Sequence, residues 1–160
     1  MRIYLDTSVF NRPYDDQSQA RVWLETLALG LILQMVEEKS VVLVVSSALR
    51  YENRRNPFPQ RQAWVNRCCA LAASTQLATE PVRDRAQYLA AAGVDPLDAL
   101  HVACAEVAGC ACLVTCDDRL VARMGAVPDT NLKVLNPLDF LLLMSGDGND
   151  DHDCAQPSSV

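Results

Sequence analysis

The sequence predicts an α/β fold in which helices cover both faces of a central, mainly parallel sheet. Continuous apolar runs at Ile3–Leu5, Val41–Val45 and Ala111–Thr115 are typical of strands that are buried on both faces. Segments of helical composition separate these runs, and strands joined through helices pair in parallel by right-handed crossovers. The 160 residues, half of them apolar, are enough for one three-layer α/β/α domain with a sizeable core.

The first strand is followed by a loop and a long helix. Asp6, Thr7 and Ser8 end the strand, and we expect the Pro- and Asp-rich segment Asn11–Ser18 to be a loop. Gln19–Glu38 is predicted to be a helix that is apolar around most of its circumference. Such a helix is buried on two sides, either by the core alone or by the core and a second copy of the chain. We therefore expect a homodimer as one of the two arrangements.

The second strand leads into a helix that is opened by a serine cap. Either Ser46 or Ser47 can cap this helix, which continues through Glu52. The elements expected next are an interruption at Asn56–Pro59, a helix over Gln60–Ala73, a short strand at Gln76–Leu77 and a helix over Glu80–Ala92.

The C-terminal part repeats the alternation of helix and strand. Asp95-Pro96 is a favoured helix opening, with Asp as N-cap and Pro in the first turn, and the helix runs to about Ala108. The elements expected after it are the strand Ala111–Thr115, a short helix to Met124, a strand at Leu132–Leu135 and a helix over Pro137–Met144. Residues 145–160 are polar, acidic and without periodicity, so we expect a domain over 1–144 and a disordered tail.

We expect a cytoplasmic chain, and the composition leaves a polyanionic partner open. The N-terminus lacks a basic segment followed by an apolar one, and no apolar run is long enough to span a bilayer. The seven cysteines have no metal-site spacing and are interpreted as free, buried side chains. The formal net charge is −6, but four of the acids and none of the bases lie in the last sixteen residues. The rest of the chain is therefore almost neutral.

Four acids are expected at one edge of the sheet. Asp6 follows the first strand, Glu52 lies on the helix after the second, Asp98 is in the first turn of its helix and Asp117 follows the strand Ala111–Thr115. The carboxyl ends of parallel strands share an edge, where ligands of open α/β sheets bind. Each acid also has a local alternative: helix capping for Asp6, Asp98 and Asp117, and a surface ion pair for Glu52.

Acids gathered at one place indicate a divalent cation. Like charges within a few ångströms destabilise one another unless a cation neutralises them. Oxygen ligands favour Mg²⁺ or Mn²⁺, and such ions accept phosphate oxygens. The pattern therefore favours hydrolysis of phosphodiester bonds with the help of a metal.

The segments that carry these acids resemble those of PIN domains, a family of metal-dependent nucleases that includes toxins of bacterial toxin–antitoxin pairs. The similar segments are YLDTSVF, SSALRYE, DPLDALHVA and LVTCDDRL, in that order. The resemblance implies that Asp6, Glu52, Asp98 and Asp117 ligate Mg²⁺ or Mn²⁺. It also implies that Thr7, Ser8 and Thr115 support the carboxylates. Asp118, beside Asp117, is the alternative ligand or an assisting residue.

The same resemblance implies an endoribonuclease. Water activated by the metal would attack in line and leave a 5′-phosphate and a 3′-hydroxyl. An antitoxin protein is the partner that the resemblance implies. The alternative is a catalytically inactive PIN-like module that binds RNA or a protein.

An arginine-rich segment adjoins Glu52. Arg50, Arg54, Arg55 and Arg61 are interpreted as the RNA-binding residues, because guanidinium groups bind phosphate in a bidentate manner. The alternative is a solvated helix face whose arginines pair with nearby glutamates. His101 is expected to pack or to hold a ligand, and the alternative is a general base.

Overall fold

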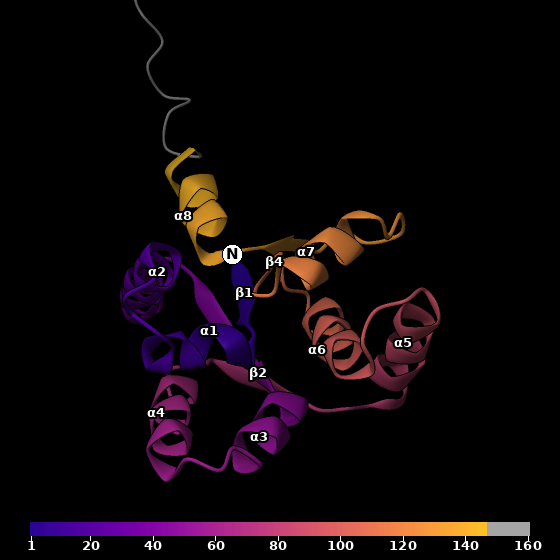
Figure 1. Cartoon of the computed structure of the whole chain (residues 1–160). Coiled ribbons are helices and arrows are strands. Elements are labelled where there is room, and N and C mark those ends of the chain that lie inside the picture. Colours follow the sequence, from indigo (N-terminus) through magenta and orange to yellow (C-terminus); the bar gives the residue numbers. More distant parts are fainter. Residues whose placement is uncertain (147–160) are drawn as a thin grey trace, which may run out of the picture.

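The computed structural model describes residues 1–146 and shows a five-stranded sheet with helices on both faces (Figure 1). The strands are β1 (Arg2–Leu5), β2 (Val42–Ser46), β3 (Ser74–Gln76), β4 (Cys112–Val114) and β5 (Lys133–Leu135). Their order in the sheet is β3-β2-β1-β4-β5, and every neighbouring pair is parallel. The predicted three-layer α/β/α fold is therefore confirmed.

The helices form the two outer layers. They are α1 (Thr7–Asn11), α2 (Ala20–Glu37), α3 (Ser47–Arg54), α4 (Pro59–Cys69), α5 (Glu80–Ala91), α6 (Pro96–Val107), α7 (Asp118–Gly125) and α8 (Pro137–Gly146). In Figure 1, α1, α2, α4 and α8 lie on one side of the strands, and α5 and α6 lie on the other. Because β1 is central, the residue that follows it is at the middle of the carboxyl edge.

Several predicted boundaries differ from the structure because tertiary contacts decide where the elements end. The first part of the predicted loop Asn11–Ser18 is helical: Asn11 is the last residue of α1, and a 3₁₀ turn, η1, follows at Arg12–Tyr14. The helix predicted over Gln60–Ala73 ends at Cys69, because the Ala73 N–H already donates to the Leu43 carbonyl of β2. β3 is correspondingly earlier than predicted.

The C-terminal helix α8 ends at Gly146, two residues beyond the predicted domain boundary. The expected disorder of the tail falls on residues 147–160, which lie outside the described residues. In residues 1–146, no helix has the length and hydropathy that a membrane crossing needs. The six described cysteines are free, and five of them are buried, as expected.

Helix α2 is buried on one side only, so the expectation that the core alone covers it is wrong. Its inner side packs into the core, whereas four large apolar residues on the other side are between 42% and 52% exposed: Trp23, Leu24, Leu27 and Leu31. We call these four residues the α2 outer stripe. Sequence periodicity showed that the helix is apolar all round, but no element within residues 1–146 covers the outer side.

Candidate functional site

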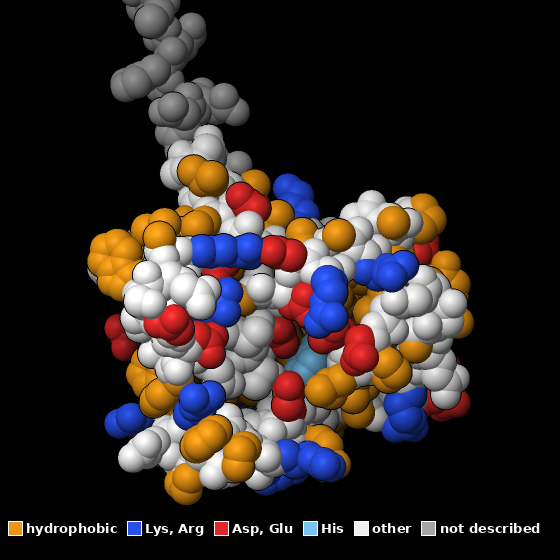
Figure 2. All heavy atoms as spheres, in the orientation of Figure 1, with side chains coloured by type: hydrophobic (Ala, Val, Ile, Leu, Met, Phe, Trp, Pro, Cys, Tyr) orange, Lys and Arg blue, Asp and Glu red, His pale blue; other side chains and the backbone are white. Residues whose placement is uncertain are grey.

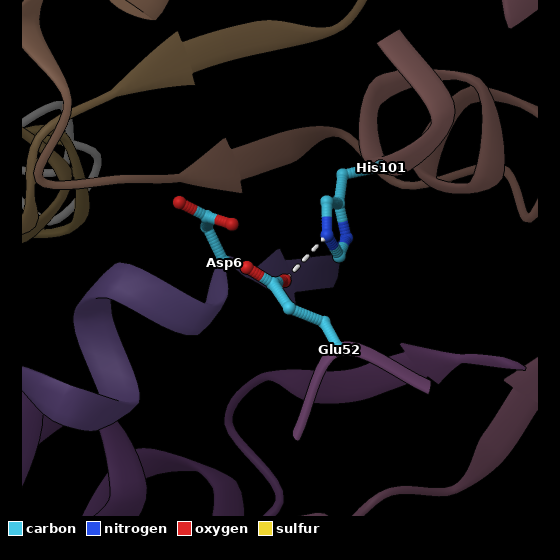
Figure 3. Close-up of side chains that lie close together, drawn as sticks. All are labelled: Asp6, Glu52 and His101. Atoms are coloured by element: carbon cyan, nitrogen blue, oxygen red, sulfur yellow. Dashed lines mark hydrogen bonds and ion pairs between the residues drawn. The ribbon is translucent and has the colours of Figure 1, made fainter. Parts of the chain in front are cut away.

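Three side chains from different elements meet at the carboxyl edge of the sheet. Asp6 follows β1, Glu52 lies on α3 and His101 lies on α6, and potential ligand atoms of the three are all within 4.8 Å of one another (Figure 3). Figure 2 shows a hollow on this face in which acidic side chains surround a histidine.

Asp6 is held by the residues that were expected to support it. The residue is 7% exposed, and its carboxylate accepts hydrogen bonds from the Thr7 N–H at 2.8 Å, the Ser8 hydroxyl at 2.6 Å and the Thr115 hydroxyl at 2.9 Å. The Cys116 N–H also donates to Ser8 Oγ at 3.1 Å. The ends of β1 and β4 are thereby joined through Asp6, which caps α1 at the same time.

Glu52 receives two hydrogen bonds, and both reach the same oxygen. The Thr7 hydroxyl and His101 Nε2 donate to Oε2, the latter at 2.9 Å, whereas no hydrogen bond from the described residues reaches Oε1. Burial by itself raises the pKa of Glu52, but the hydrogen bonds from His101 and Thr7 outweigh it, so the pKa lies below its usual value. The carboxylate is therefore ionised at neutral pH. The expected alternative, a surface pair with Arg55, is not formed.

His101 is almost fully buried, and both ring nitrogens have partners. Nδ1 lies 2.7 Å from the hydroxyl of Tyr4, and that hydroxyl lies 2.6 Å from Ser46 Oγ. Burial lowers the pKa of His101, yet the hydrogen bond to Glu52 and the charges of Asp6, Glu52 and Asp98 raise it above its usual value overall. A histidine engaged in this way holds Glu52 in place and has no free nitrogen with which to accept a proton as a general base.

Asp98 and Asp117 lie beside the tight group and not inside it. Both line a cavity of about 280 Å³ between the start of α6 and the start of α7. Burial and the charges of Asp6, Asp95 and Asp117 raise the pKa of Asp98 to about 6. In residues 1–146, no hydrogen bond or ion pair reaches the Asp98 carboxylate. Asp117 caps α7 by accepting from the Arg119 N–H at 2.8 Å.

Asp118 is directed toward another part of the molecule. Its two oxygens accept from the guanidinium of Arg21 on α2, each at 2.6 Å. Arg21 also pairs with Glu25, a fully buried glutamate that is bound by Arg12 as well. This ion-pair network ties η1, α2 and the start of α7 together, and of the two neighbouring aspartates only Asp117 lines the cavity.

The arginine-rich segment is free of ion pairs. Arg55 donates to the Tyr51 hydroxyl, and Arg61 lies over the rings of Tyr14 and Phe58. The structure, over residues 1–146, shows no ion pair of Arg50, Arg54, Arg55 or Arg61 with any acid, so the expected alternative of pairing with nearby glutamates is not formed. Their guanidinium groups are available to an external anion.

Sequence reasoning missed two further arginines at the site. Arg119 and Arg123 line the cavity together with Asp98 and Asp117, and the Arg123 guanidinium lies against Gly93, where a Cβ would come within 3.3 Å of it. Their spacing of four residues, directly after Asp117, places both on one face of α7 and was a visible signal. Tyr4 was also missed, because a tyrosine in a buried strand is indistinguishable from core.

The arrangement fits an oxygen-ligated divalent cation. Among the described residues, no donor reaches the partly buried carboxylate of Asp98 and none reaches Oε1 of Glu52. Asp6 lies beside Glu52, and its charge acts on Asp98. Within residues 1–146 no lysine or arginine forms an ion pair with these three carboxylates. Such clusters are unstable without a cation, and an all-carboxylate donor set suits Mg²⁺ or Mn²⁺.

Comparisons with known proteins agree with the fold. The family model of the PIN domain matches residues 3–126, a segment that contains all four acids. No curated protein matches the chain significantly.

Two solved structures share the fold at low sequence identity. The chain is similar to DNA-bound VapBC from Salmonella typhimurium, with a TM-score of 0.53 and 15% identity over 84% of this chain and 98% of the other. It is also similar to VapBC2 from Rickettsia felis bound to a promoter DNA fragment, with a TM-score of 0.54 and 13% identity over 84% and 98% of the two chains. On the match of the family model over most of its length, the chain belongs to the PIN-domain family, whose members are generally nucleases.

Proposed function

We propose that this chain is an Mg²⁺- or Mn²⁺-dependent endoribonuclease that hydrolyses RNA phosphodiester bonds. The observation that carries the proposal is that Asp6 and Glu52 meet at this edge, with Asp98 and Asp117 in the cavity beside them. Among the described residues, Arg119 lies 3.6 Å from Asp117, but no lysine or arginine forms an ion pair with Asp6, Glu52 or Asp98. Nuclease activity is typical of the family. The proposal goes further in two respects, the dependence on a divalent metal and the choice of RNA as the substrate.

The four acids are the groups that would hold the ion or ions. When bound, a divalent cation supplies a more acidic water and positive charge for the phosphate in the transition state. The chain's own residues prepare this arrangement. Thr7, Ser8 and Thr115 fix the Asp6 carboxylate, and Thr7 also holds Glu52. Asp118 keeps α7, and with it Asp117, in position through its pair with Arg21.

Arginines are the groups that would hold the RNA. Arg50, Arg54, Arg55 and Arg61 belong to α3, α4 and the turn between them, on the Glu52 side of the site. Arg119 and Arg123 lie on the opposite side, in α7. A single strand that contacts both groups would pass over the acids. Because these contacts are with phosphate, they position the strand without selecting a base sequence.

The alternative is an inactive PIN-like module that binds RNA or a protein. Such a module has no need for a partly buried carboxylate at Asp98 that raises the free energy of the folded state. Capping accounts for Asp6 and Asp117. A capping box begun by Asp95 would need the Asp98 carboxylate to accept from the Asp95 N–H, and the described residues show no such hydrogen bond. The site therefore favours the enzyme.

A role as the toxin of a toxin–antitoxin pair is part of the proposal. The similarity of fold to VapBC proteins supports it, and an antitoxin is then the expected protein partner. Growth arrest on expression of the wild type, but not of Asp6→Asn, tests the toxin role. The α2 outer stripe supports a homodimer, which sedimentation equilibrium of the purified chain tests.

The deciding experiment is incubation of the purified full-length chain with a mixed RNA pool in Mn²⁺, with matched single-stranded DNA as a second substrate. We expect RNA fragments with a 5′-phosphate and a 3′-hydroxyl, no cleavage in EDTA, and no cleavage by Asp6→Asn. Cleavage that survives in EDTA would contradict the metal mechanism. Cleavage of DNA at the same rate would contradict the choice of RNA.

A further inference from the structure

A line of buried polar side chains runs from the sheet to Glu52. Tyr4 and Ser46 are 0% exposed and His101 is 1% exposed, and they come from β1, β2 and α6. The successive distances are 2.6 Å from Ser46 Oγ to Tyr4 Oη, 2.7 Å from Tyr4 Oη to His101 Nδ1 and 2.9 Å from His101 Nε2 to Glu52 Oε2. Buried polar groups in an apolar core are costly unless they are paired, so this line needs an explanation.

The hydrogens in this line have one consistent arrangement when His101 is neutral. An ionised carboxylate only accepts, so His101 Nε2 carries the proton and donates to Glu52. Nδ1 then has a lone pair and accepts from the Tyr4 hydroxyl, which in turn accepts from Ser46. Ser46 Oγ also accepts from the Leu49 N–H at 3.0 Å and thereby caps α3, the helix that carries Glu52. Each hydrogen in the line points toward Glu52.

The end of the line determines which Glu52 oxygen is occupied. Both donors, His101 Nε2 and the Thr7 hydroxyl, use Oε2. Figure 3 shows the Glu52 carboxylate between the His101 ring and Asp6, with its other oxygen on the Asp6 side. The carboxylate is therefore held by one oxygen, and the second is presented to the space beside Asp6.

We propose that Ser46, Tyr4 and His101 form a positioning chain that fixes Oε2 of Glu52 and leaves Oε1 for a divalent cation. This inference rests on the proposed function, because it concerns how one of its cation-binding carboxylates is aimed. His101 and Tyr4 are positioning residues and do not touch the cation or the substrate.

The main competing role for His101 is that of a third ligand beside Asp6 and Glu52. Ligation through Nε2 would remove a donor from Glu52. Ligation through Nδ1 would leave the buried Tyr4 hydroxyl without its acceptor, in a region from which water is excluded. The His101→Gln variant distinguishes the two roles, because a glutamine N–H can replace the donor to Glu52 but its amide is a poor substitute for a ligating imidazole.

The first experiment needs no metal. His101 and His152 are the only histidines, so the His152→Gln variant of the full chain reports on His101 alone in long-range ¹H–¹⁵N spectra. In EDTA, at a pH above the titration of His101, we expect the tautomer protonated at Nε2. The tautomer protonated at Nδ1, or an average of the two, would overturn the positioning chain.

The second experiment measures Mn²⁺ binding to the full chain by calorimetry. We expect Tyr4→Phe, which removes only the hydroxyl, to weaken Mn²⁺ binding about 10-fold. This is the lower end of the usual loss in metal affinity when a residue that supports a metal ligand by hydrogen bonding is removed. His101→Ala is expected to weaken it further, and His101→Gln, which keeps an N–H donor, to recover part of the loss. The matched control is Tyr88→Phe, an exposed tyrosine on α5, with binding unchanged.

The outcomes separate this inference from the proposed function. Folded Tyr4→Phe and His101→Ala variants that bind Mn²⁺ within about twofold of the wild type would overturn the positioning chain, even if the wild type cleaves RNA. A wild type that binds Mn²⁺ with the expected losses in the variants, yet cleaves no RNA, would overturn the proposed function and leave the positioning chain. Absence of Mn²⁺ binding by the wild type would overturn the role assigned to Oε1. If Tyr4→Phe does not fold, the tautomer measurement decides.

Discussion

Glu52 and Asp98 are two carboxylates at the same edge of one sheet, and their surroundings have opposite effects. Glu52 accepts two hydrogen bonds on one oxygen, and these lower its pKa despite burial. Asp98 receives no donor from the described residues and faces other acids, which with burial raise its pKa to about 6. The protein itself stabilises the charge of Glu52, whereas no described residue stabilises the charge of Asp98, which a cation from outside would offset.

This difference divides the site into a prepared half and a dependent half. Asp6, Glu52 and their hydrogen-bond donors form the prepared half, which keeps its geometry without an ion. Asp98 and the cavity beside α7 form the dependent half. Substitutions in the two halves should therefore have similar effects on catalysis and different effects on stability.

The largest expected effect is on cleavage. Both Glu52→Gln and Asp98→Asn should lower the rate of RNA cleavage in Mn²⁺ by at least about 100-fold, because each removes a charged ligand. Asp84→Asn, an exposed aspartate on α5, is the matched control and should leave the rate unchanged. The rate is measured on a labelled RNA under single-turnover conditions. If Asp98→Asn keeps wild-type activity, Asp98 is not a ligand.

The next effect is stabilisation by the metal. Mn²⁺ at about 100 times its dissociation constant should raise the free energy of unfolding by about 2.7 kcal/mol, because it binds only the folded state. For a chain of this size, that is a rise in Tm of roughly 5–10 °C. Thermal unfolding in Mn²⁺ and in EDTA measures it. Equal melting temperatures under the two conditions are incompatible with a metal site in the folded chain.

A smaller effect distinguishes the halves in the absence of metal. In EDTA at pH 8, Asp98→Asn should stabilise the protein by about 1 kcal/mol, since it removes a repelled, partly buried charge. Glu52→Gln should destabilise it by a similar amount, since His101 and Thr7 lose a charged acceptor. Urea unfolding of both variants measures the sign. Destabilisation by both substitutions would remove the distinction between the halves.

The pH dependence of the Asp98 effect follows from its pKa. The folded value of about 6 is above the reference value of 3.8, so the folded state binds more protons between these values. Through this group, the metal-free wild type gains stability as the pH falls from 7 toward 4. Asp98→Asn lacks that gain, so its advantage over the wild type should be larger at pH 8 than at pH 5. An advantage that is independent of pH would contradict the raised pKa.

The smallest expected effect concerns the binding of RNA by the arginines. Replacing both Arg54 and Arg55 by Ala should reduce the slope of log affinity against log salt by about 1.4, because each arginine that binds a phosphate of a single strand adds roughly 0.7 to that slope. Binding is measured in EDTA, where the RNA stays intact. The same measurement on Arg119→Ala with Arg123→Ala compares the two sides of the site, and Arg83→Ala on α5 is the control. An unchanged slope rules out phosphate binding by that pair.

The fold and the edge that carries the acids were predictable because they depend on local patterns. Apolar runs identified the central strands, and the Asp-Pro pair identified the start of α6. The extent of α4 and β3 was not predictable, because β3 is defined by pairing with β2 and contains no apolar run of its own. The short helix α1 was missed because only one residue, Asp6, separates it from β1. The side chain of Asp6 can either cap a helix or bind a ligand, so its presence did not identify a helix start.

By itself, the sequence determined the α/β class, the order of the elements and the elements that carry the four acids: Asp6 and Asp117 after strands, Asp98 at a helix start and Glu52 on the helix after β2. These features arise from periodicity and capping, which act over a few residues. Only the tertiary structure decided that Asp118 pairs with Arg21, that Tyr4 lies behind His101, and that one side of α2 is uncovered. The partners in the first two contacts are each 97 residues apart in the chain, and no local pattern encodes which side chains meet across such a separation.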